Sequence, residues 1–145
     1  MAIATVLSRE QRGIDAPQVR VEVDIVGLPE AVVKESKDRV RAALINSDFQ
    51  FPAGRITVNL APADLPKEGG RFDLPIAIGI LIASGQLADA RSEVTGCELY
   101  GELSLSGELR SMKAALPAAF AACVARHPVI ARVRPAKRSF RRASS

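Results

Sequence analysis

The segment from Arg55 to Gly85 constrains the fold of this chain most, because it reads as a strand, a loop and an apolar helix. Residues 56–60 alternate between branched apolar and polar side chains, the period-two pattern of a half-buried strand. Residues 74–83 are apolar apart from one proline and one glycine. A helix that is apolar on every side is a buried helix. The other elements are therefore expected to pack around it.

Further elements are expected on both sides of this segment. Alternating side chains predict strands at residues 3–7 and 19–25, the second with one face of valines and Ile25 and one charged, solvated face. A helix should open at Pro29 and end near Ser47. A strand is expected over residues 98–105, where Gly101 indicates a bulge or a close backbone approach, and a last helix over about residues 111–126. The pattern predicts an α+β fold of two layers, with a mixed sheet and about three helices.

Charge divides the chain into two parts. The net charge is +4, yet residues 114–145 hold 7 Lys and Arg and no acid, whereas residues 1–113 hold 13 bases and 16 acids. We therefore expect a domain over residues 1–126 and a basic, disordered tail over residues 127–145, in which only Val129 and Ile130 favour a strand. The tail is a candidate nucleic-acid contact by counterion release, or simply a non-specific polycation. Its candidate residues are Arg132, Arg134, Lys137, Arg138, Arg141 and Arg142.

Composition argues against several other classes of protein. Two cysteines are too few for a disulfide framework, and Cys97 and Cys123 are expected to be half-buried thiols. No apolar run reaches the roughly 18 residues that a membrane span needs. The N-terminus lacks the basic and apolar regions of a signal peptide. These features predict a cytoplasmic protein with no membrane contact.

Three stretches together resemble a known family. They are GLPEAVVKESKDRVRAALINS, RITVNLAPADLPKEGGRFDLPIAIGILIASG and GELSLSGELR. They are similar to the N-terminal domain of the competence-protein-M, or YifB-type, magnesium-chelatase-like AAA+ ATPases, over roughly residues 1–122. The resemblance implies the fold of the Lon-protease domain, in the class of ribosomal protein S5 domain 2. It also implies that the full-length protein is a hexameric ring motor linked to DNA processing in natural transformation, so that the ring and DNA are the implied partners.

Two departures from the family pattern change what is expected of this chain. Roughly one strand and its turn, on the order of ten residues, are missing after Ile25, and an exposed sheet edge would favour self-association. No G-x-x-x-x-G-K-[ST] motif is present, so ATP and Mg²⁺ are expected only in a nucleotide-binding module, and this chain is expected to hold no cofactor. The chain thus reads as a truncated or rearranged copy, or an excised domain.

The resemblance also raises the question of a serine peptidase. Lon-type enzymes carry a P-K-[DE]-G-P-S-A-G loop, and residues 66–69 match its start, but Arg71 stands in the place of the nucleophilic serine. A guanidinium has no lone pair with which to attack a carbonyl. The position of the Lon lysine falls on Leu116. We therefore expect no enzyme; the alternative is a rebuilt Ser–Lys pair, with Lys113 as base and Ser104, Ser106 or Ser111 as nucleophile.

The same loop is a candidate site for an anion or a partner. Its residues are Lys67, Gly69, Gly70 and Arg71. Backbone N–H groups and two cations can hold a phosphate at the start of a helix. The alternative is a structural turn in which Asp73 caps the helix, Arg71 pairs with Glu68 or with solvent, and Asp73 repels an anion.

Two further candidates are expected to carry no chemistry. Asp64, Glu68 and Asp73 are oxygen donors of the kind that bind Mg²⁺, but acidic loop residues are usually solvated, and no metal is expected. His127 is expected to be a solvated loop histidine. The leading hypothesis is a non-catalytic accessory or assembly domain of a magnesium-chelatase-like motor.

Overall fold

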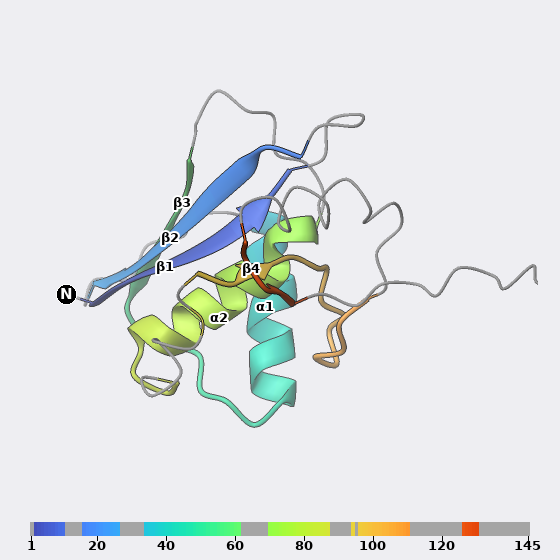
Figure 1. Ribbon diagram of the computed structural model, residues 1–145. Helices are drawn as coiled ribbons and strands as arrows, with labels where there is room; N and C mark the ends of the chain where they lie inside the picture. Colours follow the sequence, from blue (N-terminus) through green and yellow to red (C-terminus); the bar gives the residue numbers. More distant parts are fainter. Residues whose placement is uncertain are drawn as a thin grey trace, which may run out of the picture.

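The computed structural model describes residues 2–10, 16–26, 34–61, 70–87, 94, 96–110 and 126–130. Five strands form one mixed sheet; one helix packs against one of its faces, and the second helix packs against the first (Figure 1). The elements are β1 (Ala2–Arg9), β2 (Gln18–Val26), α1 (Lys34–Asn46), β3 (Arg55–Ala61), the 3-10 turn η1 (Gly70–Phe72), α2 (Asp73–Ala83), β4 (Glu98–Leu99) and β5 (Val129–Ile130). This architecture confirms the predicted α+β fold with a mixed sheet.

The sheet has the strand order β3-β2-β1-β4-β5. The first three strands are antiparallel, whereas β4 runs parallel to β1 and β5 runs parallel to β4. In this order, the two outer strands of the described sheet are β3 and β5. Strand β4 is shorter than the strand predicted over residues 98–105, because it ends at Leu99. The chain then forms a turn that is closed by a bridge between Leu103 and Leu109.

The predicted two-sided character of β2 is confirmed. Val19, Val21 and Val23 are fully buried, whereas Arg20 is exposed and Glu22 is half-buried on the opposite face. Alternation places successive side chains on opposite faces of a strand. The buried face of β2 is the one that α2 covers.

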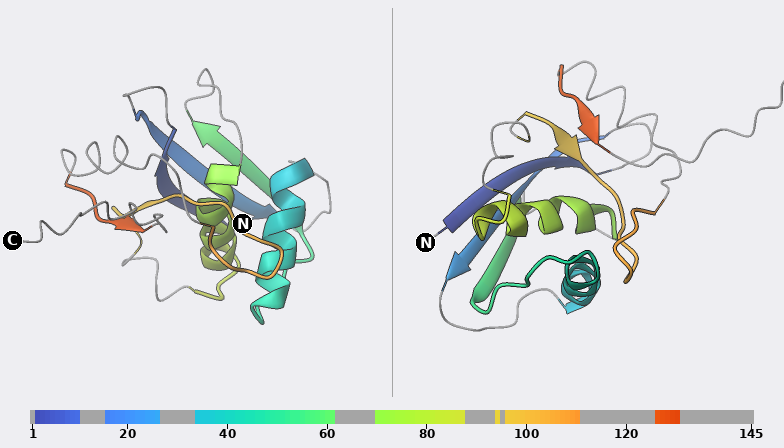
Figure 2. Two further views of the ribbon diagram at one scale, coloured as in Figure 1. Left: turned by 90° about the vertical axis from the view of Figure 1, so that its right-hand side faces the viewer. Right: turned by 90° about the horizontal axis from the view of Figure 1, so that it is seen from below.

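The predicted burial of α2 is also confirmed. Ile76, Ile80, Leu81 and Ile82 are at most 4% exposed, and the helix contacts both β1 and β2. Figure 2 shows α2 lying along the sheet with α1 beside it on the same face. The expected third helix falls within residues 111–125, outside the described part of the chain. Neither helix in the described ranges is long and apolar enough to cross a membrane.

Gly79 sets the distance between α2 and β2. A Cβ atom built there would lie 2.6 Å from the Cγ2 atom of Val23. We expect Gly79→Ala to lower the free energy of unfolding by about 1–2 kcal/mol, because the overlap outweighs the gain of about 1 kcal/mol in helix propensity. In a Val23→Ala background the same change should cost less, since the clashing methyl group is gone. Urea unfolding of the four proteins tests this, and an equal cost in both backgrounds would show that the clash is not the cause.

Candidate functional site

The 3-10 turn η1, at the end of the candidate anion loop, lies against the segment that follows β4. Gly70 is buried, and a Cβ atom on it would collide with the side chain of Glu102. The Gly101 N–H donates to the carbonyl of Arg71 at 2.8 Å, and the Leu74 N–H donates to the carbonyl of Gly101 at 3.0 Å. The close backbone approach expected at Gly101 is thus present. Of the candidate anion loop, Gly70 and Arg71 are described, whereas Lys67 and Gly69 lie outside the described residues.

The prediction that Asp73 caps α2 is wrong. Phe72 occupies the cap position and no side chain caps the helix. Asp73 is instead the first helical residue and is fully buried. Its Oδ2 atom accepts hydrogen bonds from Arg39 Nε at 2.8 Å and from the Leu103 N–H at 3.1 Å, while Oδ1 accepts one from Arg39 Nη2 at 3.2 Å. The carboxylate therefore turns inward because a cation on α1 and a backbone donor both meet it there.

This placement of Asp73 bears on whether an anion could bind at the turn. A carboxylate that pairs with a guanidinium contributes little net charge to its surroundings. The expected repulsion of an anion by Asp73 is therefore weakened, because Arg39 neutralises it. What the turn presents beside α2 is the cation of Arg71.

Arg71, which the resemblance of the loop matches to the Lon-type serine, packs against an aromatic ring. Its guanidinium carbon lies 5.4 Å from the centroid of the Tyr100 ring, a cation–π distance. The side chain is half-buried rather than solvated. Burial lowers the pKa of the Arg71 guanidinium, and the charges of Glu10 and Tyr100 act in the opposite direction. The arrangement can bind or position an anionic group, but a guanidinium cannot serve as a nucleophile.

A second charged cluster, which sequence reasoning missed, lies beside this turn. Glu98 on β4 is fully buried, and its two oxygens accept hydrogen bonds from Arg9 Nε and, at 2.8 Å, from Arg9 Nη2. His127 Nδ1 lies 2.7 Å from Glu98 Oε2. The prediction of a solvated His127 is therefore wrong, because the ring joins this buried carboxylate. The residues next to Glu98 in the sequence do not show that its carboxylate is buried and paired, because its partner Arg9 lies 89 residues away.

The residues after His127 join the sheet through the same strand. The Glu98 N–H donates to the carbonyl of Pro128 at 2.8 Å, and the Tyr100 N–H donates to that of Ile130 at 3.3 Å. Val129 and Ile130 thus form the expected strand, β5. The basic residues proposed for nucleic-acid contact, from Arg132 onward, lie outside the described residues.

Tyr100 is influenced both by Arg71 and by the charged cluster around Glu98, so its titration is a direct probe of both. Burial, and secondarily the charge of Glu98, raises the pKa of Tyr100, while Arg71 and Arg9 oppose that shift. Because this is the only tyrosine, tyrosinate absorbance reports on it alone. We expect a titration midpoint above that of free tyrosine, and Arg71→Gln should raise it further by removing a cation. A midpoint that fell, or did not move, in the variant would contradict the contact.

The raised pKa of Tyr100 also fixes the sign of a stability effect. The unfolded chain ionises its tyrosine near the ordinary value of about 10, while the folded chain still holds the proton. Unfolding therefore releases a proton above that pH, and the contribution of Tyr100 to stability is lost as the pH rises further. The free energy of unfolding should fall above about pH 10.

The serines of the alternative peptidase reading lie in the turn after β4. Ser104 Oγ lies 2.8 Å from Ser106 Oγ and accepts the Glu108 N–H at 3.1 Å. Within the described part of the chain, neither hydroxyl is bonded to a lysine or a histidine. Ser111, Lys113 and Leu116 lie outside that part.

The remaining candidates give no site in the described residues. Asp64 and Glu68 of the imagined magnesium site, and Cys123, are not among them. Over the ranges that the structure covers, no three His, Cys, Asp or Glu side chains gather as metal ligands. Cys97 is half-buried, as expected.

Comparison with known proteins identifies close relatives. The competence protein ComM of Haemophilus influenzae is 56% identical over 131 residues, which cover 84% of this chain and 25% of ComM. The YifB proteins of Salmonella typhimurium and Escherichia coli are 52% and 51% identical over 128 residues, which cover 82% of this chain and 25% of each relative. This chain therefore spans about a quarter of the length of these relatives.

The alignment with ComM also contains positions that this chain lacks. It has 131 positions, whereas 84% of 145 residues is about 122, so about nine positions of ComM have no counterpart here. That number agrees in size with the segment of on the order of ten residues expected to be missing. The family model described as subunit ChlI of Mg-chelatase matches residues 14–133. The chain therefore belongs to the magnesium-chelatase ChlI family, in which its relatives include ComM and YifB.

Proposed function

We propose that this chain is a non-catalytic accessory domain that helps a magnesium-chelatase-like AAA+ motor of the ComM and YifB type to assemble and to contact its partners. The observation that carries the proposal is the position of Arg71. At the place where a Lon-type peptidase holds its serine, this chain holds a guanidinium packed on Tyr100. Function depends on such sites and not on the fold that carries them.

The fold proposed for the domain is that of ribosomal protein S5 domain 2, as in the Lon-protease domain. The described mixed sheet with both helices on one face is compatible with it. In this proposal the peptidase fold is kept as a scaffold. The positions of its catalytic groups are taken by Arg71 and Leu116, neither of which can act as the nucleophile or the base.

The proposed role in DNA processing comes from the relatives. ComM is named a competence protein, and the resemblance implies a hexameric motor for the whole protein. This chain would then supply contacts within the assembly, while ATP and Mg²⁺ would be bound by a separate nucleotide-binding module of the full-length motor. Asp73 and Glu98 both accept hydrogen bonds from groups within the domain, which supports a structural role for both carboxylates.

An exchange experiment tests the accessory role. The matched quarter of H. influenzae ComM is replaced by this chain, and the hybrid is compared with intact ComM and with ComM lacking that quarter. We expect the hybrid to form the same oligomer as intact ComM in analytical ultracentrifugation, and the shortened protein to assemble less well. Assembly of the shortened protein as complete as that of intact ComM would contradict the proposal, as would a hybrid that behaves like the shortened protein.

A further inference from the structure

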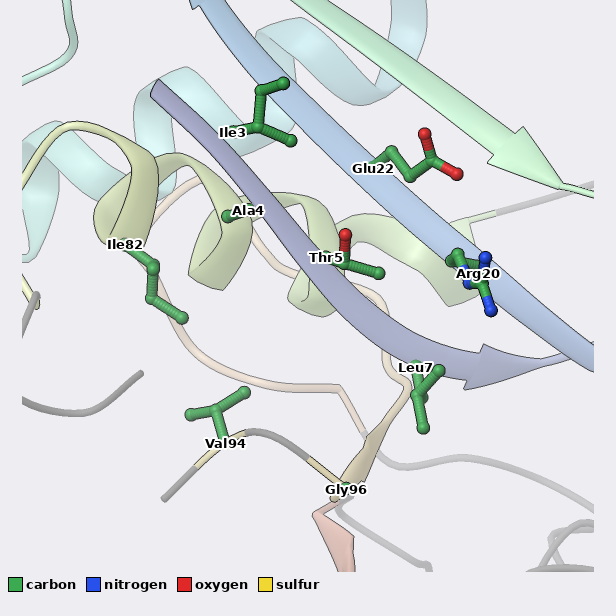
Figure 3. A pocket seen from close by; sticks show the side chains of 9 residues that line it. All are labelled: Ile3, Ala4, Thr5, Leu7, Arg20, Glu22, Ile82, Val94 and Gly96. Atoms are coloured by element: carbon green, nitrogen blue, oxygen red, sulfur yellow. The ribbon is translucent and has the colours of Figure 1, made fainter. Parts of the chain in front are cut away.

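A groove beside β1 has no role in the site described above. It has a volume of about 550 Å³. Figure 3 shows Ile82 and Val94 on one side of β1 and the two charged side chains of β2 on the other. We call it the β1 groove and define it by Ile3, Thr5, Leu7, Arg20, Glu22 and Val94.

The spacing of its side chains suits an extended peptide. Ile3, Thr5 and Leu7 follow at alternate positions of β1 and therefore share one face of the sheet. Ile3 is 50% exposed although it is a large apolar residue, and Leu7 is half-buried. An extended segment also projects side chains at every second residue, so it can match this row along its length.

The charges of the groove favour a protein partner over a nucleic acid. Arg20 lies opposite Leu7 and Glu22 lies opposite Thr5 in the β1–β2 register. Among the described residues neither charge makes an ion pair or a side-chain hydrogen bond. Among the described lining residues one cation and one anion balance each other, whereas nucleic acid binding needs a surplus of positive charge. A peptide segment that carries an acid and a base beside apolar residues complements both charges.

The relatives indicate where such a segment would come from. This chain corresponds to 25% of ComM and of YifB, so three quarters of each relative lie outside the match. An accessory domain has to contact that larger part. We propose that the β1 groove binds an extended segment of the remaining three quarters of a ComM-type protein, one with alternating apolar residues flanked by an acid and a base. This inference rests on the proposed accessory function.

A peptide array tests the groove without requiring the partner to fold. Overlapping peptides that cover H. influenzae ComM outside the matched quarter are probed with this chain and with two variants. Ile3→Glu places a charge in the groove, whereas Ile45→Glu makes the same change at a side chain that is 48% exposed at the end of α1. Because both sites are exposed, both variants should keep the far-ultraviolet circular dichroism and the melting temperature of the parent.

We expect a small set of peptides with alternating apolar residues to bind. Ile3→Glu should lower their affinity by about tenfold or more, because a charge would replace an apolar contact, and Ile45→Glu should change it by less than about twofold. Absence of binding to every peptide would overturn the groove proposal, and so would an equal loss in both variants. Either failure is distinguishable from failure of the accessory role, which the ComM exchange measures by assembly.

Discussion

Replacing Glu98 by Gln is expected to lower the free energy of unfolding by about 3–5 kcal/mol, the cost of breaking a buried ion pair on one side. Glu98 is fully buried and its partner Arg9 has a side chain that is only 8% exposed. The amide cannot neutralise Arg9, and its NH₂ group would face the donors of Arg9 and His127. The loss should be measured by urea unfolding at neutral pH.

Glu102→Gln is the matched control for this prediction. It is the same substitution four positions along the chain, but the Arg110–Glu102 pair is 3.9 Å apart with side chains 62% and 44% exposed. Exposed pairs contribute little, so a change within about 0.5 kcal/mol is expected. Similar losses for the two variants would contradict the assignment of Glu98 as the central acceptor of the cluster.

Asp73→Asn should lower the free energy of unfolding by about 3 kcal/mol, because it removes a buried charge that holds three segments together. Asp73 joins Arg39 on α1 and the N–H of Leu103 in the turn after β4 to the start of α2. The carboxylate accepts these hydrogen bonds with two oxygens, whereas the amide of asparagine has only one acceptor oxygen. The same variant should also increase hydrogen exchange at the Leu103 amide.

Asp38→Asn provides the control for this second prediction, because Asp38 is exposed on α1, next in sequence to Arg39. A change within about 0.5 kcal/mol is expected there. If Asp73→Asn left the Leu103 amide as protected as in the parent chain, the bond from that amide to the carboxylate would not contribute to stability in solution.

Local patterns allowed the regular elements to be predicted. The alternation in β2 and the continuous apolar run of α2 are properties of neighbouring residues, so they are visible in the sequence, and both burial patterns are confirmed. The strand after Gly85 was predicted too long, because the Leu103–Leu109 bridge closes a turn where alternation alone predicted a continuing strand.

The charged clusters could not be predicted, because their partners are distant in the sequence. Glu98 and Arg9 are separated by 89 residues, and Asp73 and Arg39 by 34. Before the fold is known, a buried carboxylate cannot be told from a solvated one. Asp73 therefore looked like a helix cap and His127 like a loop residue. For Arg71, the resemblance to Lon-type enzymes identified the position, and the structure added the stacking partner, Tyr100.

The proposed function requires a domain that acts through contacts and breaks no bonds in a substrate. Intact-mass spectrometry after incubation with a serine-reactive fluorophosphonate, together with a peptide-library cleavage assay, tests this most directly. An accessory domain should show an unmodified mass and no cleavage, for the parent chain and for Ser104→Ala alike. A single stoichiometric adduct on Ser104, Ser106 or Ser111, with cleavage abolished by replacing that serine with alanine, would contradict it.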